Sequence, residues 1–142
     1  MPYLRTRTEG AVRPCPPTRI LLAEDDPELR SLLAEALRRD GHQVMEVANG
    51  VALDDVIREL AAQSPGHPHE IVISDVRMPG RTGLSVLETH RGWPWCPRFI
   101  FMTGFGDEDL RAVARDLGAA AVIEKPFEMD ELREVLEDVV TH

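Results

Sequence analysis

The sequence lacks long apolar runs and has few cysteines, and these two shortages exclude several classes of protein. No stretch approaches the roughly 18 consecutive apolar residues of a membrane-spanning helix. The N-terminal arginines are followed by no apolar segment of the kind found in secretory signals. Cys15 and Cys96 provide neither a disulfide framework nor a cysteine-rich metal site. We therefore expect a cytoplasmic protein with no membrane partner.

Lysine is almost missing. Of the 16 basic residues one is lysine, Lys125, and all the others are arginine. Codon bias explains an arginine-rich surface, in which case one lysine merely survives. The alternative is that this position requires an ammonium group that a guanidinium cannot replace. Composition does not distinguish the two explanations.

The charge is acidic and unevenly distributed. The net charge of the 142 residues is −9, whereas the first nineteen residues hold four arginines against one glutamate, or +3, so the remainder carries −12. An acidic domain is a poor general nucleic-acid binder, and we expect no direct contact with nucleic acid. Residues 1–17 contain four prolines and no apolar period, which predicts a flexible tail or linker before a folded domain at 18–142.

From Thr18 onward, short apolar runs alternate with helical patterns. The runs at 20–23, 44–48, 71–73, 99–102 and 121–123 are typical of buried strands. Helical spacing of leucine and valine follows each run, and the first helix is framed by Asp26 as N-cap, Pro27 at its first position and Gly41 after its end. This alternation predicts an α/β sandwich around a parallel sheet.

Polar residues whose side chains can bind ligands or react lie at the ends of four of these strands. They are the acidic run Glu24-Asp25-Asp26, then Asp75, Thr103 and Lys125. Parallel strands end at one rim, where open α/β sheets bind ligands. Clustered carboxylates without histidine or cysteine suit Mg²⁺, and a carboxylate can also act as a nucleophile. An ammonium and a hydroxyl beside them suit a phosphoryl group.

Four short motifs give the chain from Ile20 to Val140 its resemblance to the receiver domain of bacterial two-component response regulators. They are Leu-Ala-Glu-Asp-Asp at 22–26, Asp-Val-Arg-Met-Pro at 75–79 with Gly83 beyond it, Met-Thr-Gly at 102–104, and Glu-Lys-Pro-Phe at 124–127. Each motif is weak alone, but their order at the ends of alternating strands is specific. The resemblance implies a flavodoxin-like (βα)5 fold, a doubly wound sheet of five parallel strands in the order 2-1-3-4-5.

The resemblance also implies a metal site and a phosphoacceptor. Asp75 would be phosphorylated, and Mg²⁺ (or Mn²⁺) would be held by Glu24, Asp25, Asp75 and the backbone carbonyl of Arg77. Asp26 is not counted among the ligands, because its position before Pro27 already gives it a role as a helix cap.

Two further residues would act on the phosphoryl group. Thr103 would bond one of its oxygens, and Lys125 would form an ion pair with it, aimed by a cis Lys125–Pro126 bond. In many receivers an aromatic residue lies three positions before this lysine; here it is Val122, which puts the usual readout in doubt. We also expect Arg77 and Phe105 to obstruct water and to slow dephosphorylation.

The function implied is that of a receiver that catalyses its own phosphorylation and slow dephosphorylation without being a conventional enzyme. The donor would be a histidine kinase or phosphotransfer protein, and the output would be a downstream protein or a covalently linked output domain. A homodimer would form through the fourth helix, the fifth strand and the last helix.

Two alternatives to a phosphorylated receiver belong to other functional classes, an enzyme and an interaction module. A phosphohydrolase of the haloacid dehalogenase type normally carries a second Asp where this chain has Arg77, and a receiver-like interaction module without phosphorylation would lack the acids or the lysine. No other catalytic group of residues is expected. The tryptophans are predicted to pack in a loop. The histidines form no recognisable triad and are predicted to lie at the surface. The residues concerned are Trp93, Trp95, His42, His67, His69, His90 and His142.

Overall fold

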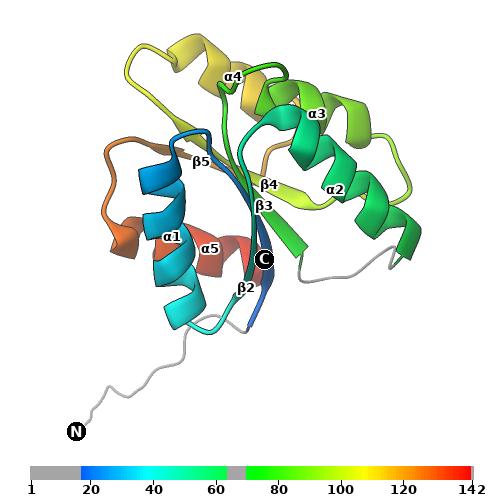
Figure 1. Cartoon of the computed structure of the whole chain (residues 1–142). Coiled ribbons are helices and arrows are strands. Elements are labelled where there is room, and N and C mark those ends of the chain that lie inside the picture. Colours follow the sequence, from blue (N-terminus) through cyan, green and yellow to red (C-terminus); the bar gives the residue numbers. More distant parts are fainter. Residues whose placement is uncertain (1–16, 64–69, 142) are drawn as a thin grey trace, which may run out of the picture.

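The structure, a computed structural model, describes residues 17–63 and 70–141, in which five strands alternate with five helices (Figure 1). The strands are β1 (Arg19–Ala23), β2 (Gln43–Val47), β3 (Glu70–Asp75), β4 (Arg98–Thr103) and β5 (Ala121–Glu124). The helices are α1 (Pro27–Arg39), α2 (Gly50–Gln63), α3 (Gly83–His90), α4 (Glu108–Asp116) and α5 (Met129–Thr141). Residues 1–16, most of the predicted N-terminal segment, lie outside the described residues, so its flexibility stays a prediction.

The strands form one parallel sheet in the order β2-β1-β3-β4-β5, which confirms the predicted topology. The order reverses direction after β2, so β3 lies at the centre and all six of its residues are buried. In such sheets the crevice beyond the carboxyl ends of the strands is the usual ligand site.

Helices cover both faces of the sheet, as Figure 1 shows, with α1 and α5 on one face and α2, α3 and α4 on the other. Alternate side chains of each strand enter the two cores. In β1, Ile20 and Leu22 pack with the leucines of α1 and α5, whereas Leu21 and Ala23 pack with α2 and α3. Burial on both faces is why the strands appear in the sequence as continuous apolar runs.

The helix starts differ in one informative way. Asp26 caps α1 by accepting the backbone N–H groups of Glu28 and Leu29, and Thr82 caps α3 by accepting that of Ser85. Asp107 occupies the same position before α4, but its side chain makes no capping hydrogen bond. Its carboxylate is used elsewhere.

Two histidines are buried, and their predicted surface position is wrong. His42 is 6% exposed, and its Nδ1 accepts the backbone N–H of Thr18. His90 is fully buried, with Nε2 2.5 Å from Oδ1 of Asp54. The expectation failed because each imidazole has a distant partner that permits burial. The other predicted surface histidines, His67, His69 and His142, lie outside the described residues.

Asp54 organises the contact between α2 and α3. Its carboxylate, besides His90, accepts a hydrogen bond from Nε of Arg58 at 2.8 Å and lies 3.2 Å from a guanidinium nitrogen of Arg81. Trp93 packs edge-on against His90, with ring centroids 4.1 Å apart, and the guanidinium of Arg58 lies over the indole. The predicted packing role of Trp93 is therefore confirmed.

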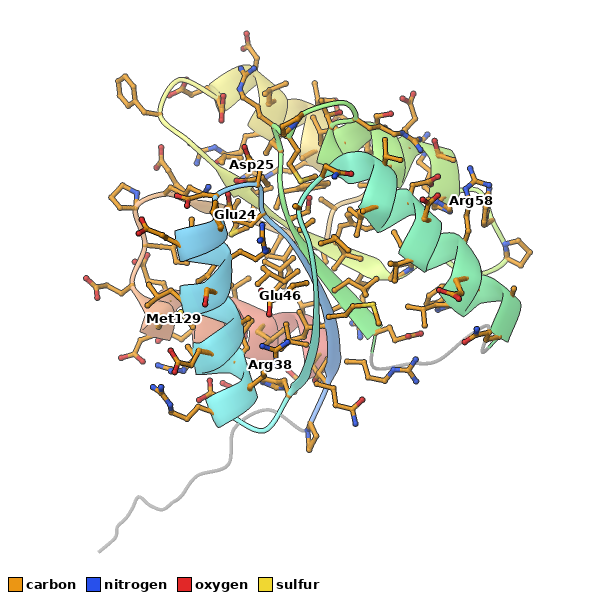
Figure 2. All side chains as sticks on the ribbon, in the orientation of Figure 1. Glu24, Asp25, Arg38, Glu46, Arg58 and Met129 are labelled. Atoms are coloured by element: carbon orange, nitrogen blue, oxygen red, sulfur yellow. The ribbon has the colours of Figure 1, made fainter. Side chains whose placement is uncertain are left out.

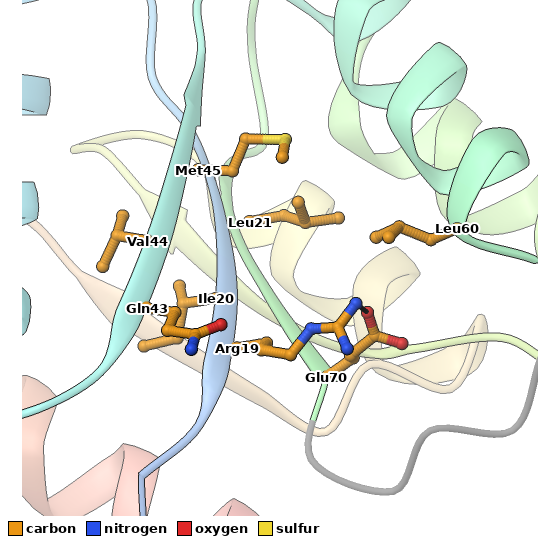
Figure 3. Close-up of a pocket in the computed structure, with 8 residues that line it drawn as sticks. All are labelled: Arg19, Ile20, Leu21, Gln43, Val44, Met45, Leu60 and Glu70. Atoms are coloured by element: carbon orange, nitrogen blue, oxygen red, sulfur yellow. Dashed lines mark ion pairs between the residues drawn. The ribbon is translucent and has the colours of Figure 1, made fainter. Parts of the chain in front are cut away.

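A cavity of about 260 Å³, shown in Figure 3, is lined by residues of β1, β2 and α2 and by Glu70 at the start of β3. Most of its lining is apolar, and its charged groups, Arg19 and Glu70, are 2.9 Å apart. Two of its lining residues, Leu60 and Glu70, lie before and after segment 64–69 in the sequence, and that segment is outside the described residues. We assign it no chemistry.

Candidate functional site

The sheet register brings the predicted site residues to one rim. Glu24 follows β1, Asp75 ends β3, Thr103 ends β4 and Lys125 follows β5. Ala23 pairs with Ser74, Asp75 with Met102 and Thr103 with Glu124, so the strands end at nearly the same level. Figure 2 shows Glu24 and Asp25 at this end of the sheet, just before α1.

Lys125 joins the two buried carboxylates. Its Nζ lies 2.7 Å from Oδ1 of Asp75 and 3.0 Å from Oε1 of Glu24. The Lys125–Pro126 peptide bond is cis, as predicted. The lysine is partly exposed, so its ammonium neutralises the buried acids while part of the side chain reaches solvent.

The acidic loop after β1 is held by its own hydrogen bonds. The second carboxylate oxygen of Glu24 accepts the backbone N–H of Asp26 at 3.0 Å, and Arg30 donates to the backbone carbonyl of Glu24 at 2.8 Å. Glu24 is 1% exposed, whereas Asp25 is exposed. The loop therefore offers one fixed and one accessible carboxylate.

Three carboxylates are close enough to bind one cation. Single oxygens of Glu24, Asp25 and Asp75 all lie within 4.8 Å of one another. An all-oxygen set from a few acids, one of them open to water, fits Mg²⁺ or Mn²⁺. Asp26 is not in this group; it caps α1, which confirms its predicted role as a helix cap.

The carboxylates of Asp75 and Glu24 influence each other's pKa. Burial and the adjacent Glu24 raise the pKa of Asp75 to about 7, although Lys125 opposes the rise. Burial also disfavours ionisation of Glu24, but hydrogen bonds with Asp75, the Asp26 N–H and Lys125 outweigh it and lower the pKa of Glu24. Crowded acids of this kind gain from a cation that replaces the proton.

Thr103 is buried at the rim, but its hydroxyl is turned toward β5. Oγ1 donates to the backbone carbonyl of Ile123 at 3.4 Å. Contact with a phosphoryl group on Asp75 therefore requires this weak hydrogen bond to be exchanged. Val122, beside Ile123, is half-buried against the core on the α4 side.

The side chains of Arg77 and Phe105 do not cover the site, as the expectation that they obstruct water would require. Nε of Arg77 donates to Oδ1 of Asp107 at 2.9 Å, and Phe105 is 98% exposed. Both side chains must move before they can shield a phosphoryl group from water. Slow dephosphorylation by these residues stays a prediction.

The structure shows why position 83 is a glycine. A Cβ there would lie 2.5 Å from the backbone oxygen of Asp75 and 2.6 Å from the hydroxyl of Ser74. The glycine thus allows the start of α3 to approach the end of β3 closely.

An apolar groove of about 430 Å³ opens beside Lys125, between α1 and the loops that follow β4 and β5. Leu32 and Phe105, both strongly exposed, are among its lining residues. The other residues that line it are Leu29, Leu33, Gly104, Lys125, Pro126, Phe127 and Met129.

A strand-end aspartate paired with a lysine, beside an acidic cation cluster on a doubly wound sheet, defines a phosphoryl-accepting signalling domain. The sequence pattern of the response regulator receiver domain matches residues 20–137, and the chain belongs to this family of two-component systems. A dehalogenase-type site gains no support, since the guanidinium of Arg77 stands where its second acid would be.

Individual proteins similar to this chain support the family assignment. Sporulation initiation phosphotransferase F of Bacillus subtilis is 32% identical over 119 residues, covering 83% of this chain and 90% of that protein. Transcriptional regulatory protein PdtaR of Mycobacterium tuberculosis is 33% identical over 126 residues, covering 88% of this chain but 58% of that protein. Full-length FixJ of B. japonicum superposes with a TM-score of 0.74 at 33% identity, over 87% of this chain and 58% of that one.

The chain thus spans little more than half of some relatives and most of another. None of the helices in the described part of the chain has the length and apolar character needed to cross a bilayer.

Proposed function

We propose that Asp75 is the phosphoacceptor and that Glu24, Asp25, Asp75 and the backbone carbonyl of Arg77 hold Mg²⁺ (or Mn²⁺). The observation that carries this proposal is the contact of Lys125 with both Asp75 and Glu24, at 2.7 and 3.0 Å, inside the three-carboxylate cluster. When bound, the cation supplies positive charge that neutralises the acids and the phosphoryl oxygens.

In the transfer, a carboxylate oxygen of ionised Asp75 attacks the phosphorus of a phosphohistidine. A P–O bond forms, the P–N bond breaks, and the imidazole leaves with the electron pair and takes a proton. Lys125, already 2.7 Å from the attacked carboxylate, stabilises the charge on the transferred group. Thr103 then exchanges the Ile123 carbonyl for a phosphoryl oxygen, and this change alters the population of conformations.

The donor is proposed to be a histidine kinase or a phosphotransfer protein in the cytoplasm. A protein donor must approach Asp75 over the rim, where the groove lined by Leu32 and Phe105 presents apolar surface. The output is a downstream protein or a linked output domain. Dimerisation through α4, β5 and α5 remains part of the proposal.

Intact mass spectrometry after incubation with Mg²⁺ and acetyl phosphate tests the assignment. The wild-type protein should gain one HPO₃ group, and Asp75→Asn should gain none. Unmodified wild-type protein, or equal labelling of Asp75→Asn, would overturn the role of Asp75.

A further inference from the structure

Asp107 uses its carboxylate in an unexpected way. It stands at the N-cap of α4 but leaves the helix uncapped, whereas Asp26 and Thr82 cap theirs. Its Oδ2 accepts the backbone N–H of Gly104 at 2.8 Å, and its Oδ1 accepts Nε of Arg77 at 2.9 Å. Asp107 is 7% exposed, so both contacts are made by a nearly buried carboxylate.

These contacts close the turn after β4. The N–H of Asp107 donates to the carbonyl of Gly104 at 3.3 Å, and Gly106 between them has a positive φ of 88°. The two hydrogen bonds between Gly104 and Asp107 hold the turn at both ends and leave Phe105, at its tip, in solvent.

The same carboxylate connects the two loops that phosphorylation must coordinate. Gly104 directly follows Thr103, whose hydroxyl is bonded to Ile123. Arg77 lies two residues beyond Asp75, in the loop proposed to hold the cation. Any displacement of Thr103 toward Asp75 therefore acts on the turn that Asp107 fixes.

We propose that Asp107 restrains phosphoryl acceptance through Arg77: its carboxylate holds the turn 104–107 to Arg77 before phosphorylation, and Arg77 is released when Asp75 carries a phosphoryl group. This inference rests on the proposed function of Asp75. A phosphoryl group adds close to two negative charges, and the guanidinium of Arg77, 70% exposed, is free to exchange Asp107 for them.

The charge on Asp107 suits this role. Each oxygen of its carboxylate accepts a hydrogen bond, one from the Gly104 N–H and one from the cationic Arg77, and such partners favour the charged form. Arg111, on α4, adds a weaker attraction but is also paired with Glu124 of β5. A contact that favours the unphosphorylated arrangement opposes phosphorylation by its own free energy.

Beryllofluoride, a phosphoryl analogue that binds aspartate with Mg²⁺, provides the test. Asp107→Asn keeps an oxygen for Gly104 but removes the charge that holds Arg77. We expect it to tighten beryllofluoride binding by roughly two- to fivefold, the upper part of the range for one ion pair with an exposed arginine. Asp109→Asn, an exposed acid two residues on, is the matched control and should change nothing.

The double variant separates positioning from general stability. Arg77→Gln should abolish the effect of Asp107→Asn, because the two side chains act through one contact. Relative to the wild-type protein, the Gly104 amide proton resonance should move upfield in Asp107→Ala, because alanine cannot accept this N–H. Thermal unfolding of each variant checks that it folds.

The outcomes are distinct. If the wild-type protein neither binds beryllofluoride nor accepts phosphate from acetyl phosphate, the proposed function fails. If it does both, but Asp107→Asn matches Asp109→Asn or binds the analogue more weakly, the role of Asp107 is wrong. Equal effects of Asp107→Asn with and without Arg77 would overturn the release of that arginine.

Discussion

The Nζ atom of Lys125 lies 2.7 Å from Oδ1 of Asp75, and the same nitrogen lies 3.0 Å from Glu24. The chain's single lysine, which follows β5, therefore bridges two carboxylates at the ends of β1 and β3. Its position favours the explanation that this site requires an ammonium. A planar guanidinium on a different stem cannot place one nitrogen between two carboxylates in the same way.

Lys125→Arg should accept phosphate from acetyl phosphate at least tenfold more slowly than the wild-type protein, although the net charge is unchanged. The rate of HPO₃ addition, followed by intact mass, measures the effect. A variant that labels at the wild-type rate would refute the special role of the ammonium.

Asp25→Asn should weaken Mg²⁺ binding about tenfold or more, because the cation loses one charged ligand. Titration calorimetry of the protein with MgCl₂ gives the affinity. Asp26→Asn is the control: its carboxylate caps α1, asparagine caps equally well, and Mg²⁺ affinity should stay the same. Equal losses in both variants would argue against the proposed ligand set.

The apparent Mg²⁺ affinity should rise between pH 6 and pH 8. The pKa of Asp75 is raised to about 7, so the carboxyl is mostly protonated at the lower pH and mostly ionised at the higher one. Cation binding releases this proton. Calorimetry in buffers of different ionisation enthalpy measures the release, and Asp75→Asn should remove it; a flat profile in the wild-type protein would contradict the assignment.

Gly83→Ala should destabilise the fold by about 1–3 kcal/mol, since the new methyl group forces the backbone of Asp75 and α3 apart. Urea unfolding measures the loss. Gly92→Ala serves as control, because nothing lies within 4 Å of its added Cβ. If the two variants have equal stability, the close approach of α3 to β3 is not required.

Asp54→Asn should cost about 2–3 kcal/mol at pH 7, because His90, Arg58 and Arg81 lose a shared, nearly buried carboxylate. Burial opposes ionisation of Asp54, but these partners outweigh it and lower its pKa. Its stabilisation is therefore present above the unfolded pKa of about 3.9 and lost as pH falls through the lower folded value.

Urea midpoints of the wild-type protein and Asp54→Asn should therefore converge in acid. Asp55→Asn, at the exposed neighbouring position, should match the wild type throughout. A difference between wild type and Asp54→Asn that stays constant down to the acid limit would show that charge is not the cause.

Most of the fold was predictable because its signals are local. The apolar runs, the Asp26–Pro27 start of α1 and Gly41 with its positive φ of 99° each depend on neighbouring residues. The strand order came from resemblance to a family, since periodicity does not specify which strands are adjacent. The rim followed from parallel strands, and the register confirms it.

Long-range polar partnerships were not predictable. The sequence gives no sign that Asp54 meets His90, although His90 lies three and four residues after Leu87 and Val86, on their buried helix face. Asp107 directly precedes α4 and is of a residue type that favours capping. Its carboxylate turns to Gly104 and Arg77 instead, a choice set by loop geometry.

The central strand β3 is buried along its whole length, whereas only one of the four residues of the edge strand β5 is fully buried. Amide hydrogens of β3 should exchange last and those of β5 much sooner, since an edge strand opens at lower free energy. Asp75 is the last residue of this buried central strand, whereas Lys125 follows the edge strand β5, which also carries the Ile123 carbonyl bonded to Thr103. We therefore expect the proposed phosphoacceptor to lie on the strand that opens last, and the residues proposed to respond to its phosphorylation to lie on or beside a strand that opens more easily.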